Sequence, residues 1–337
     1  MAIGNTTSAV IDPVIRDFYD GMALMRALPL LLHGKFGQER PIDQKSGDRA
    51  KFRRIESVTV NAAPIIEMVT PSPVQITKTD ITVTLDQYGA YCKYSDKVSY
   101  TTQDPYLAEQ SAVMGESEGQ TLDVVFRDKL LATTSIYYAG APTITTRATV
   151  VARALGTDFD RIARAFHNAN AKPFDPNIIN ASTGVGTVPQ RAAYYVIVHP
   201  DVQYDIDNTT NFPGFIPVAA YPDATRAIEG EFGAYKEFRF VSTTFANVLL
   251  GAGAAVASTG LKSTGGLIDV YQCLIFGQNA YGKVPLNGRS HEVMVTGLEA
   301  SHANPLGQFG TIGWKSMQTL VLLNETFMTR YECGAIA

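Results

Sequence analysis

The sequence predicts an α+β fold, in which the chain passes between extended and helical stretches without internal repeats. Asp104-Pro105 joins a helix-capping residue to a proline suited to a first turn, and no proline follows before Pro142, which leaves room for a long helix. Residues 81–94 begin with alternating apolar and polar side chains, as a strand with one buried face does. Residues 194–295 mix short apolar runs with glycine-rich turns, which indicates a unit of strands and short connections.

The composition is that of a folded protein with few charges. The chain has 337 residues, of which 45% are hydrophobic and 18% charged, and at about 150 residues per domain this length suits roughly two domains. The net charge of −4 provides no basic field for holding phosphates, so composition does not support sequence-independent nucleic-acid binding. Cys92, Cys273 and Cys333 are isolated and odd in number, which predicts neither a disulfide framework nor a zinc site.

No targeting segment is recognisable. Residues 1–8 lack a basic residue followed by an apolar core, and the first apolar run, residues 22–32, is too short to cross a bilayer. We therefore expect a protein without a membrane contact that folds in a reducing cytoplasm.

The N-terminal part predicts one helix, an extended arm and a long two-stranded excursion. Asp12-Pro13 is a helix start, and apolar residues recur at helical spacing up to Pro29. Residues 30–47 look extended, and residues 52–60 and 81–94 are strand-like. The connection between these two strands carries prolines, which do not fit inside a paired central strand; they are Pro64, Pro71 and Pro73.

The long helix is predicted to run from residue 104 to about residue 132. Small residues, Ala108, Ala112, Gly115 and Gly119, form a stripe along one face. Each glycine inside a helix costs about 1 kcal/mol relative to alanine. We interpret Gly115 and Gly119 as packing residues that let another backbone cross the helix closely.

The rest of the chain predicts a second helix and several short strands. The second helix spans residues 158–171, and the C-terminal residues 311–331 return to a strand pattern that includes the only tryptophan, Trp314. His199 is expected at the end of a strand, with Asp201 as the N-cap of the following helix. The remaining predicted strands are residues 194–198, 238–241, 270–276 and 292–295.

No catalytic, cofactor or metal motif is present. The sequence lacks a GxSxG elbow, a GxxxxGK[ST] phosphate loop and an HExxH zinc helix. Residues 251–256 resemble a dinucleotide-binding loop only superficially, because Val256 stands where the third glycine belongs. The five histidines show no ligand spacing. We therefore predict no catalytic residues, no cofactor and no enzyme activity.

Two segments carry opposite charge. Residues 35–54 have seven basic and three acidic side chains, whereas residues 104–132 have six acidic and two basic ones. Such complementarity suits docking of one subunit's basic segment on a neighbour's helix, and two solvated faces that never meet are an equally open interpretation. The predicted contact residues are Lys51, Arg53 and Arg54 on the basic segment and Glu109, Glu116, Glu118 and Asp123 on the helix.

The order of these elements resembles that of tailed-bacteriophage major capsid proteins with the Hong Kong 97 fold, and several segments resemble the coat protein family of N-four-like phages. The resemblance covers nearly the whole chain in order and is strongest at its C-terminal end. Phe309 departs from it, because the family pattern has a basic residue there. The matching segments are ALP (27–29), HGKFG (33–37), KFRR (51–54), QYG (87–89), TLD (121–123), RD (127–128), HPDV (199–202), EGEFG (229–233), FG (276–277), AYG (280–282), NPLGQ (304–308) and GTIGWK (310–315).

The resemblance implies a division of the chain into named parts. It places Lys51, Arg53 and Arg54 at the base of a loop that reaches over a neighbour, near that neighbour's acidic helix, and it makes Trp314 a buried packing anchor. The implied parts are an N-terminal arm (1–46), an E-loop (47–90), a P-domain (91–190 and 293–337, with its spine helix at about 104–132) and an A-domain (191–292).

The resemblance also implies a function. A major capsid protein self-assembles into hexamers and pentamers that form an icosahedral head shell around double-stranded DNA, without sequence-specific binding. Implied partners are further copies of the chain, scaffolding and portal proteins and, in some members, decoration proteins; the implied location is the virion, after assembly in the host cytoplasm. Two alternatives stay open, an encapsulin-like nanocompartment of the same fold and an enzyme with an unrecognised site.

Overall fold

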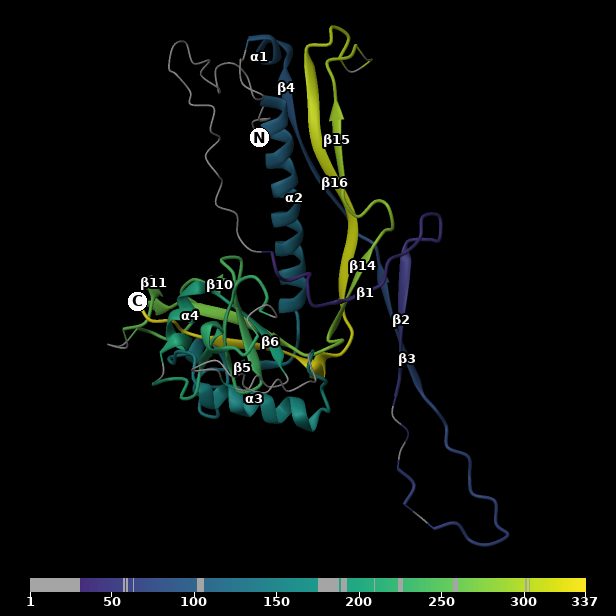
Figure 1. Ribbon diagram of the computed structural model, residues 1–337, viewed down its shortest axis with the longest axis vertical. Coiled ribbons are helices and arrows are strands. Elements are labelled where there is room, and N and C mark those ends of the chain that lie inside the picture. The colour runs from purple at the N-terminus through teal and green to yellow at the C-terminus, as the bar shows by residue number, and fades with distance from the viewer. Residues whose placement is uncertain are drawn as a thin grey trace.

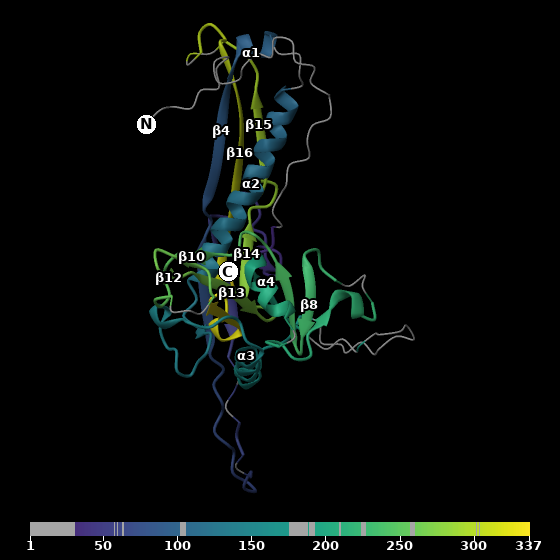
Figure 2. The same cartoon turned by 90° about the vertical axis from the view of Figure 1, so that its left-hand side faces the viewer.

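The computed structural model of the chain is elongated (Figure 1). A tall part made by α2, β4, β15 and β16 rises from a compact part that holds α3 and α4, and the hairpin of β2 and β3 projects in the opposite direction (Figures 1 and 2). The structure describes residues 31–337 except 57, 59, 63, 102–105, 175–187, 189–192, 209, 224–226, 257–259, 301 and 303. The helix predicted between Asp12 and Pro29 lies outside the described residues.

Helix α2, Tyr106–Leu131, confirms the predicted long helix. Its 26 residues give a rod of about 39 Å at 1.5 Å per residue. Its upper part lies along β16, and its last turns bury Leu122, Phe126 and Leu130 in the compact part. The short helix α1, Asp96–Thr101, precedes it. The rod therefore connects the two parts of the molecule.

A five-stranded sheet supports the tall part. Its central strand β16 has 14 residues, long enough for β4 to pair with residues 309–317 along one side while β15 and then β14 pair along the other. Between β15 and β14, residues 286–291 leave the ladder and return, held by Met317 and Ser316 of β16. The strands are β1 (Gln38–Glu39), β4 (Gln87–Ser95), β14 (Tyr281–Pro285), β15 (Glu292–Thr296) and β16 (Phe309–Leu322).

The prediction of one strand over residues 81–94 is wrong. The chain leaves the hairpin strand β3 (Lys78–Thr84) at Leu85 and enters β4, which belongs to another sheet. Asp86 lies at this change of direction, and Lys129 of α2 binds its carboxylate at 2.5 Å. The alternating pattern continues through the junction because each strand has one buried face.

The compact part contains an eight-stranded mixed sheet. The predicted strands at residues 194–198 and 270–276 are confirmed as β6 and β13. Both are buried along their whole length, which explains their unbroken apolar runs. The strand order is β5 (Ile136–Tyr138), β17 (Met328–Cys333), β13 (Val270–Phe276), β6 (Tyr194–Val198), β9 (Phe238–Ser242), β8 (Glu231–Tyr235) and β7 (Ile216–Pro217), with β10 (Val248–Leu249) beside β13.

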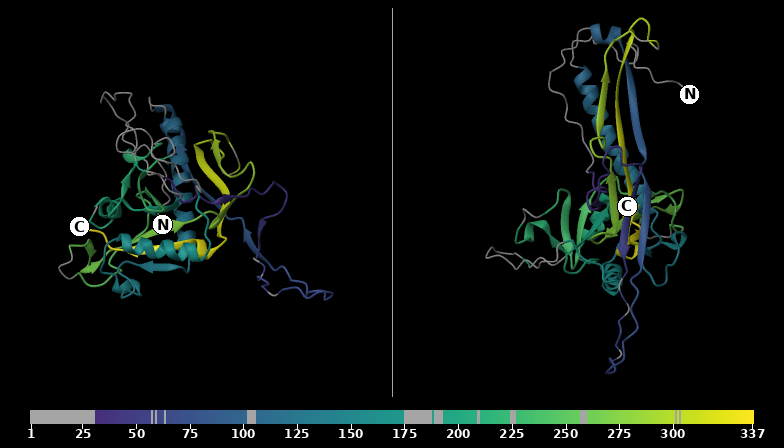
Figure 3. Two further views of the ribbon diagram at one scale, coloured as in Figure 1. Left: turned by 60° about the horizontal axis from the view of Figure 1, so that its bottom comes forward. Right: turned by 90° about the vertical axis from the view of Figure 1, so that its right-hand side faces the viewer.

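Alternate residues of these strands enter two separate cores. Val196 of β6 packs with Phe159 of α3 on one face, whereas Ile197 packs with Phe126 of α2 on the other. The helices on the first face are α3 (Gly156–Asn168) and α4 (Pro200–Asp207). The sheet is therefore sandwiched between α2 and the α3–α4 layer (Figure 3). The remaining short elements are the 3₁₀ turns at Arg147–Thr149, Val218–Ala220 and Glu325–Phe327 and the strands β11 (Ser263–Thr264) and β12 (Leu267–Ile268).

This sheet bears on the predicted domain boundary after residue 190. Strands β5 and β17 and helix α3 fall on the P-domain side of that boundary, yet they share one sheet and one core with β6 and β13. A boundary that divides a sheet would break its ladder. The sheet thus favours assigning α3, β5 and β17 to the same structural unit as β6 and β13.

The cap of α4 differs from the prediction. His199 is the N-cap, and its Nδ1 accepts a hydrogen bond of 3.2 Å from the Asp201 amide. Asp201 lies in the first turn, where its carboxylate accepts a hydrogen bond from the Tyr271 hydroxyl and binds Lys262. Pro200 at the first helical position moves the start of the helix two residues earlier than an Asp201 cap requires.

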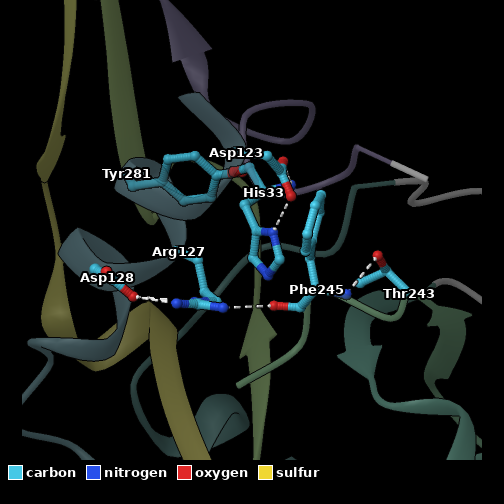
Figure 4. Close-up of polar contacts among 7 residues, drawn as sticks. All are labelled: His33, Asp123, Arg127, Asp128, Thr243, Phe245 and Tyr281. Atoms are coloured by element: carbon cyan, nitrogen blue, oxygen red, sulfur yellow. Dashed lines mark hydrogen bonds and ion pairs between the residues drawn. The ribbon is translucent and has the colours of Figure 1, made fainter. Parts of the chain in front are cut away.

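The segment before β1 is anchored to α2 and β14 through His33 (Figure 4). The His33 amide donates to Asp123 Oδ1 at 2.8 Å, and its Nδ1 lies 2.6 Å from Oδ2. The Tyr281 hydroxyl donates to the His33 carbonyl and accepts from the Phe36 amide. His33 and Asp123 are 1% and 4% exposed, so these contacts are shielded from water. Two elements distant in sequence therefore hold the arm in one place.

A buried carboxylate ties the C-terminal strand to its neighbours. Glu332 of β17 receives two hydrogen bonds from Arg147 and one from Gln272, and Arg330 lies 2.9 Å away. Burial raises the pKa of Glu332, but the hydrogen bonds from Arg147 and Gln272 outweigh it, so the pKa lies below the ordinary 4.5. Because the folded-state pKa is lowered, this stabilisation is present above pH 4.5 and is lost as the pH falls through the folded-state value.

Glu332→Gln should destabilise the subunit by roughly 3 kcal/mol at neutral pH, since it leaves Arg330 buried without its ionic partner while Arg147 keeps some access to water. Thermal unfolding of the unassembled subunit between pH 3 and pH 7 measures this. The difference from wild type should shrink below about pH 4.5, as the pH falls towards the lowered folded-state pKa of Glu332. The exposed Glu299→Gln is the control; an equal loss at every pH would contradict the assignment.

Asp123→Ala should lower the free energy of unfolding by about 2 kcal/mol, because it leaves the buried His33 amide and imidazole without an acceptor. Urea denaturation of the unassembled subunit measures the shift in midpoint. Asp128→Ala on the same helix is the matched control, since this carboxylate is 59% exposed, and it should change the free energy by no more than about 0.5 kcal/mol. Equal effects of the two variants would show that the anchor contributes no stability.

Candidate functional site

The projecting hairpin carries more exposed large apolar side chains than any other segment of the described chain. We call residues 58–76 the hairpin tip. Met68 is 100% and Val60 87% exposed, and an apolar segment of this extent marks a binding surface. The other exposed apolar side chains of the tip are Val58, Ile65, Ile66, Val69, Val74 and Ile76.

The base of the hairpin is fixed to the body. Strand β2 (Arg49–Ile55) pairs in register with β3, and Phe52 is buried against Val284 of β14. Gly282 permits this contact, because a Cβ at that position would lie 2.8 Å from the Phe52 ring. The tip, by contrast, has few backbone bonds, such as that from the Val69 amide to the Ile66 carbonyl. The hairpin is therefore firmly attached to the body at its base and exposes an apolar tip.

The basic residues of the base differ in their partners. Arg53 of β2 binds Asp80 of β3 through two hydrogen bonds of 2.8 and 3.1 Å, which lowers the pKa of Asp80. Arg54 binds Glu56 at 2.8 Å, and this bond lowers the pKa of Glu56. Lys51 lies on the exposed face of β2. These ion pairs are solvated, so they contribute little to stability and leave the cations accessible to a partner.

A groove of about 470 Å³ lies where the hairpin base meets the body. Its apolar lining comes from both strands of the hairpin and from the chain around β14, including Phe52, Ile81 and Leu323. Its polar lining is basic or amide, and among the described residues no acidic side chain lines it. The polar lining residues are Gln38, Arg40, Arg53, Arg54, Asn170, Lys172, Gln278, Asn279 and Asn324.

Helix α2 presents fewer free carboxylates than the sequence suggests. Glu118 is buried and binds His291 at 2.9 Å, and Asp123 is buried against His33. Glu109 is exposed, and Glu116 is partly buried. Burial within the subunit leaves Glu118 and Asp123 no surface for a neighbour, which corrects the prediction for these two residues. Their histidine partners could not be predicted from the sequence, because both contacts join segments far apart in the chain.

The packing residues of the sequence analysis lie in different environments. Among the described residues, a Cβ at Gly115 would meet nothing within 4 Å, whereas one at Gly119 would lie 2.7 Å from Leu31 Cδ1. In this part of the chain, a side chain and not a backbone therefore lies against the helix at Gly119. Trp314 is 3% exposed. Lys93 lies 4.7 Å from the centre of the Phe309 ring. The family pattern has a basic residue at position 309, whereas here Phe309 binds the cation of Lys93 through its ring.

Two cysteines lie close together although the sequence separates them. In the β13–β17 ladder, Cys273 faces Tyr331 while Cys333 faces Tyr271. A hydrogen bond with Cys273 and burial raise the pKa of the Cys333 thiol well above its ordinary value. Both are free and buried, which makes them poor nucleophiles.

Among the described residues, no group of three or more His, Cys, Asp or Glu side chains is arranged to hold a metal ion. No helix in the described part of the chain is long and apolar enough to cross a membrane. The prominent surface features of the subunit are thus the apolar hairpin tip, the groove at its base and the exposed charges beside them.

Comparison with known structures places the fold. The chain matches the capsid of Ralstonia phage GP4 with a TM-score of 0.68 and 12% identity, covering 99% of each chain. It matches the capsid of Cyanophage P-SCSP1u with a TM-score of 0.62 and 14% identity, over 98% of this chain and 96% of that one. An encapsulin from Synechococcus elongatus, SrpI, matches at 0.55 and 8% identity over 98% and 96% of the two chains.

These identities establish the fold alone, which is the Hong Kong 97-type α+β fold that the sequence predicts. No curated protein sequence matches the chain. A family model described as phage capsid protein matches residues 78–293, which is well over half of the 337 residues. The chain therefore belongs to the phage capsid protein family.

Proposed function

We propose that copies of this chain assemble into hexamers and pentamers that form a closed icosahedral head shell around double-stranded phage DNA. Membership of the phage capsid protein family supports assembly into a shell. The observation that carries the proposal is the projecting hairpin, whose tip has no apolar partner within the described part of its own subunit. A repeated contact of this kind between identical copies closes into rings.

The proposed parts of the subunit follow the fold. The β2–β3 hairpin is the E-loop that reaches over a neighbour, α2 is the spine of the P-domain, and the compact part contains the A-domain. Residues 1–46 form the N-terminal arm, whose last part the His33 anchor positions. Trp314 anchors the P-domain sheet from within.

The exposed face of the hairpin base is the proposed partner of a neighbour's helix. Lys51 and Arg53 lie on this face of β2, and Glu109 and Glu116 are the predicted contact carboxylates of α2 that are not fully buried. Opposite charges at such a contact favour the correct register and steer association.

Shell building requires no chemistry at the subunit, so we propose that the chain has no catalytic activity and that its location is the virion head after assembly in the host cytoplasm. Scaffolding, portal and decoration proteins are proposed partners, and the DNA is enclosed without sequence-specific contacts. The second candidate is an encapsulin-like compartment, which the match to SrpI favours. Particles that contain a protein cargo and no DNA would support that candidate.

Replacing residues 57–76 by Asn-Gly should leave a folded subunit that forms no shells. The hairpin packs on the body only near Ala50 and Phe52, so removal of the tip takes away exposed surface and no core. Electron microscopy counts shells, and thermal unfolding should give the wild-type melting temperature. Normal shells from this variant would overturn the role of the hairpin. A wild-type chain that elutes only as a small oligomer under every condition would overturn the shell itself.

Lys51→Glu and Glu109→Lys should each lower the yield of shells without changing subunit stability, because each places like charges opposite one another between copies. The double variant restores opposite charges and should recover the yield. Sedimentation of assembled material measures it, and Lys45→Glu, a cation outside the proposed face, is the control. Failure of the double variant to improve on the single ones would contradict this pairing.

A further inference from the structure

The groove at the hairpin base has the chemistry of a receptor for an apolar segment that carries one carboxylate. Its apolar lining, which we call the floor, ranges from the buried Phe52 to the exposed Ile55, which are 5% and 68% exposed. Its polar lining, which we call the rim, carries four cations and several amides, and no acidic side chain of the described residues lines the groove. A wholly apolar occupant would leave the cations of this rim without an ionic partner. A strongly acidic occupant would leave the apolar side chains of the floor exposed to water.

Two of the four cations have no carboxylate partner among the described residues. Arg53 and Arg54 bind Asp80 and Glu56. Arg40 lies over the Phe52 ring, with its guanidinium carbon 5.5 Å from the ring centre, and Lys172 is exposed and lines the same groove. A carboxylate bound in the groove would therefore have two cations available as partners.

The hairpin tip is the segment of this chain that matches. Residues 58–76 contain a single charged residue, Glu67, and it lies between Ile66 and Met68. Met68 adopts a positive φ of 61°, and the Val69 amide donates a hydrogen bond to the Ile66 carbonyl. Glu67 therefore lies in the turn at the end of the hairpin. Glu67 and both apolar neighbours are exposed.

The tip cannot reach the groove of its own subunit, because the hairpin extends away from its base (Figure 1). We propose that the groove of one subunit receives the hairpin tip of a neighbour, with Glu67 between Arg40 and Lys172 and with Ile66 and Met68 against the Phe52 floor. This inference rests on the proposed shell-building function and names the receptor for the hairpin. Donor and receptor are different surfaces, so the contact runs head to tail, and it forms a ring when the rotation between copies closes.

Charge exchange tests the pairing. Glu67→Lys alone, and Arg40→Glu with Lys172→Glu, should each reduce the assembled fraction about tenfold or more, the order of effect of one interfacial charge pair. The triple variant restores opposite charges and should recover most of the yield. Glu67 is exposed and makes no contact on which folding depends, so Glu67→Lys remains informative even if the groove variants misfold. Glu299→Lys, an exposed carboxylate elsewhere, is the control.

A cross-link gives a direct readout. Glu67→Cys combined with Gln278→Cys at the groove rim should, on mild oxidation of assembled material, link subunits into covalent multimers, whereas neither single variant should. The native thiols of Cys273 and Cys333 are buried and will not interfere, and the partly buried Cys92 is replaced by serine in every variant. Multimers and charge rescue together support the proposal.

Three outcomes would overturn it: normal shells from Glu67→Lys, no cross-link in shells that do form, or rescue of the groove variants by Glu109→Lys in place of Glu67→Lys. The last result would assign the groove to helix α2 of the neighbour. Failure of the wild-type chain to form shells would instead overturn the proposed function, so the two failures are distinguishable.

Discussion

The last turns of α2 pack against the eight-stranded sheet, and the positions of the other parts depend on this contact. Leu122, Phe126 and Leu130 enter the same core as Ile197 and Phe276. Because α2 is a rigid rod, fixing its lower end fixes the direction of the tall sheet above. The arm before β1 is held on the same turns, so the hairpin that follows β1 is set in place by the same contact.

The base of the hairpin packs on the body of the subunit, whereas the apolar side chains of the tip have no partner within the described part of the chain. Phe52 and Ala50 are buried on β14, and Gly282 supplies the space. Beyond Ile55 the strands part, and the large apolar side chains face water. Such a surface is costly for a single subunit, because exposed apolar area promotes association. In an assembling protein that cost favours the contact between copies over the free subunit.

Burial reduces the charge that the subunit offers to neighbours. The helix segment has six acidic residues in the sequence, yet Glu118 and Asp123 are bound to histidines within the subunit. On the hairpin base the cations remain exposed, and Arg40 and Lys172 have no carboxylate partner among the described residues. The net charge of a segment is therefore a poor guide to an interface, because burial decides which charges a partner can reach.

The sequence by itself determined the long helix, predicted at about residues 104–132, and the strands β6 and β13, since capping residues, proline positions and apolar runs act locally. The resemblance of its segments to known capsid proteins indicated the family of the fold. Tertiary structure decided the break between β3 and β4 at Asp86, the cap at His199, the neighbouring thiols of β13 and β17, and the burial of Asp123. It also assembled the groove, whose lining residues come from residue 38 to residue 327. Each of these features depends on which distant segments lie side by side, and a local pattern does not contain that information.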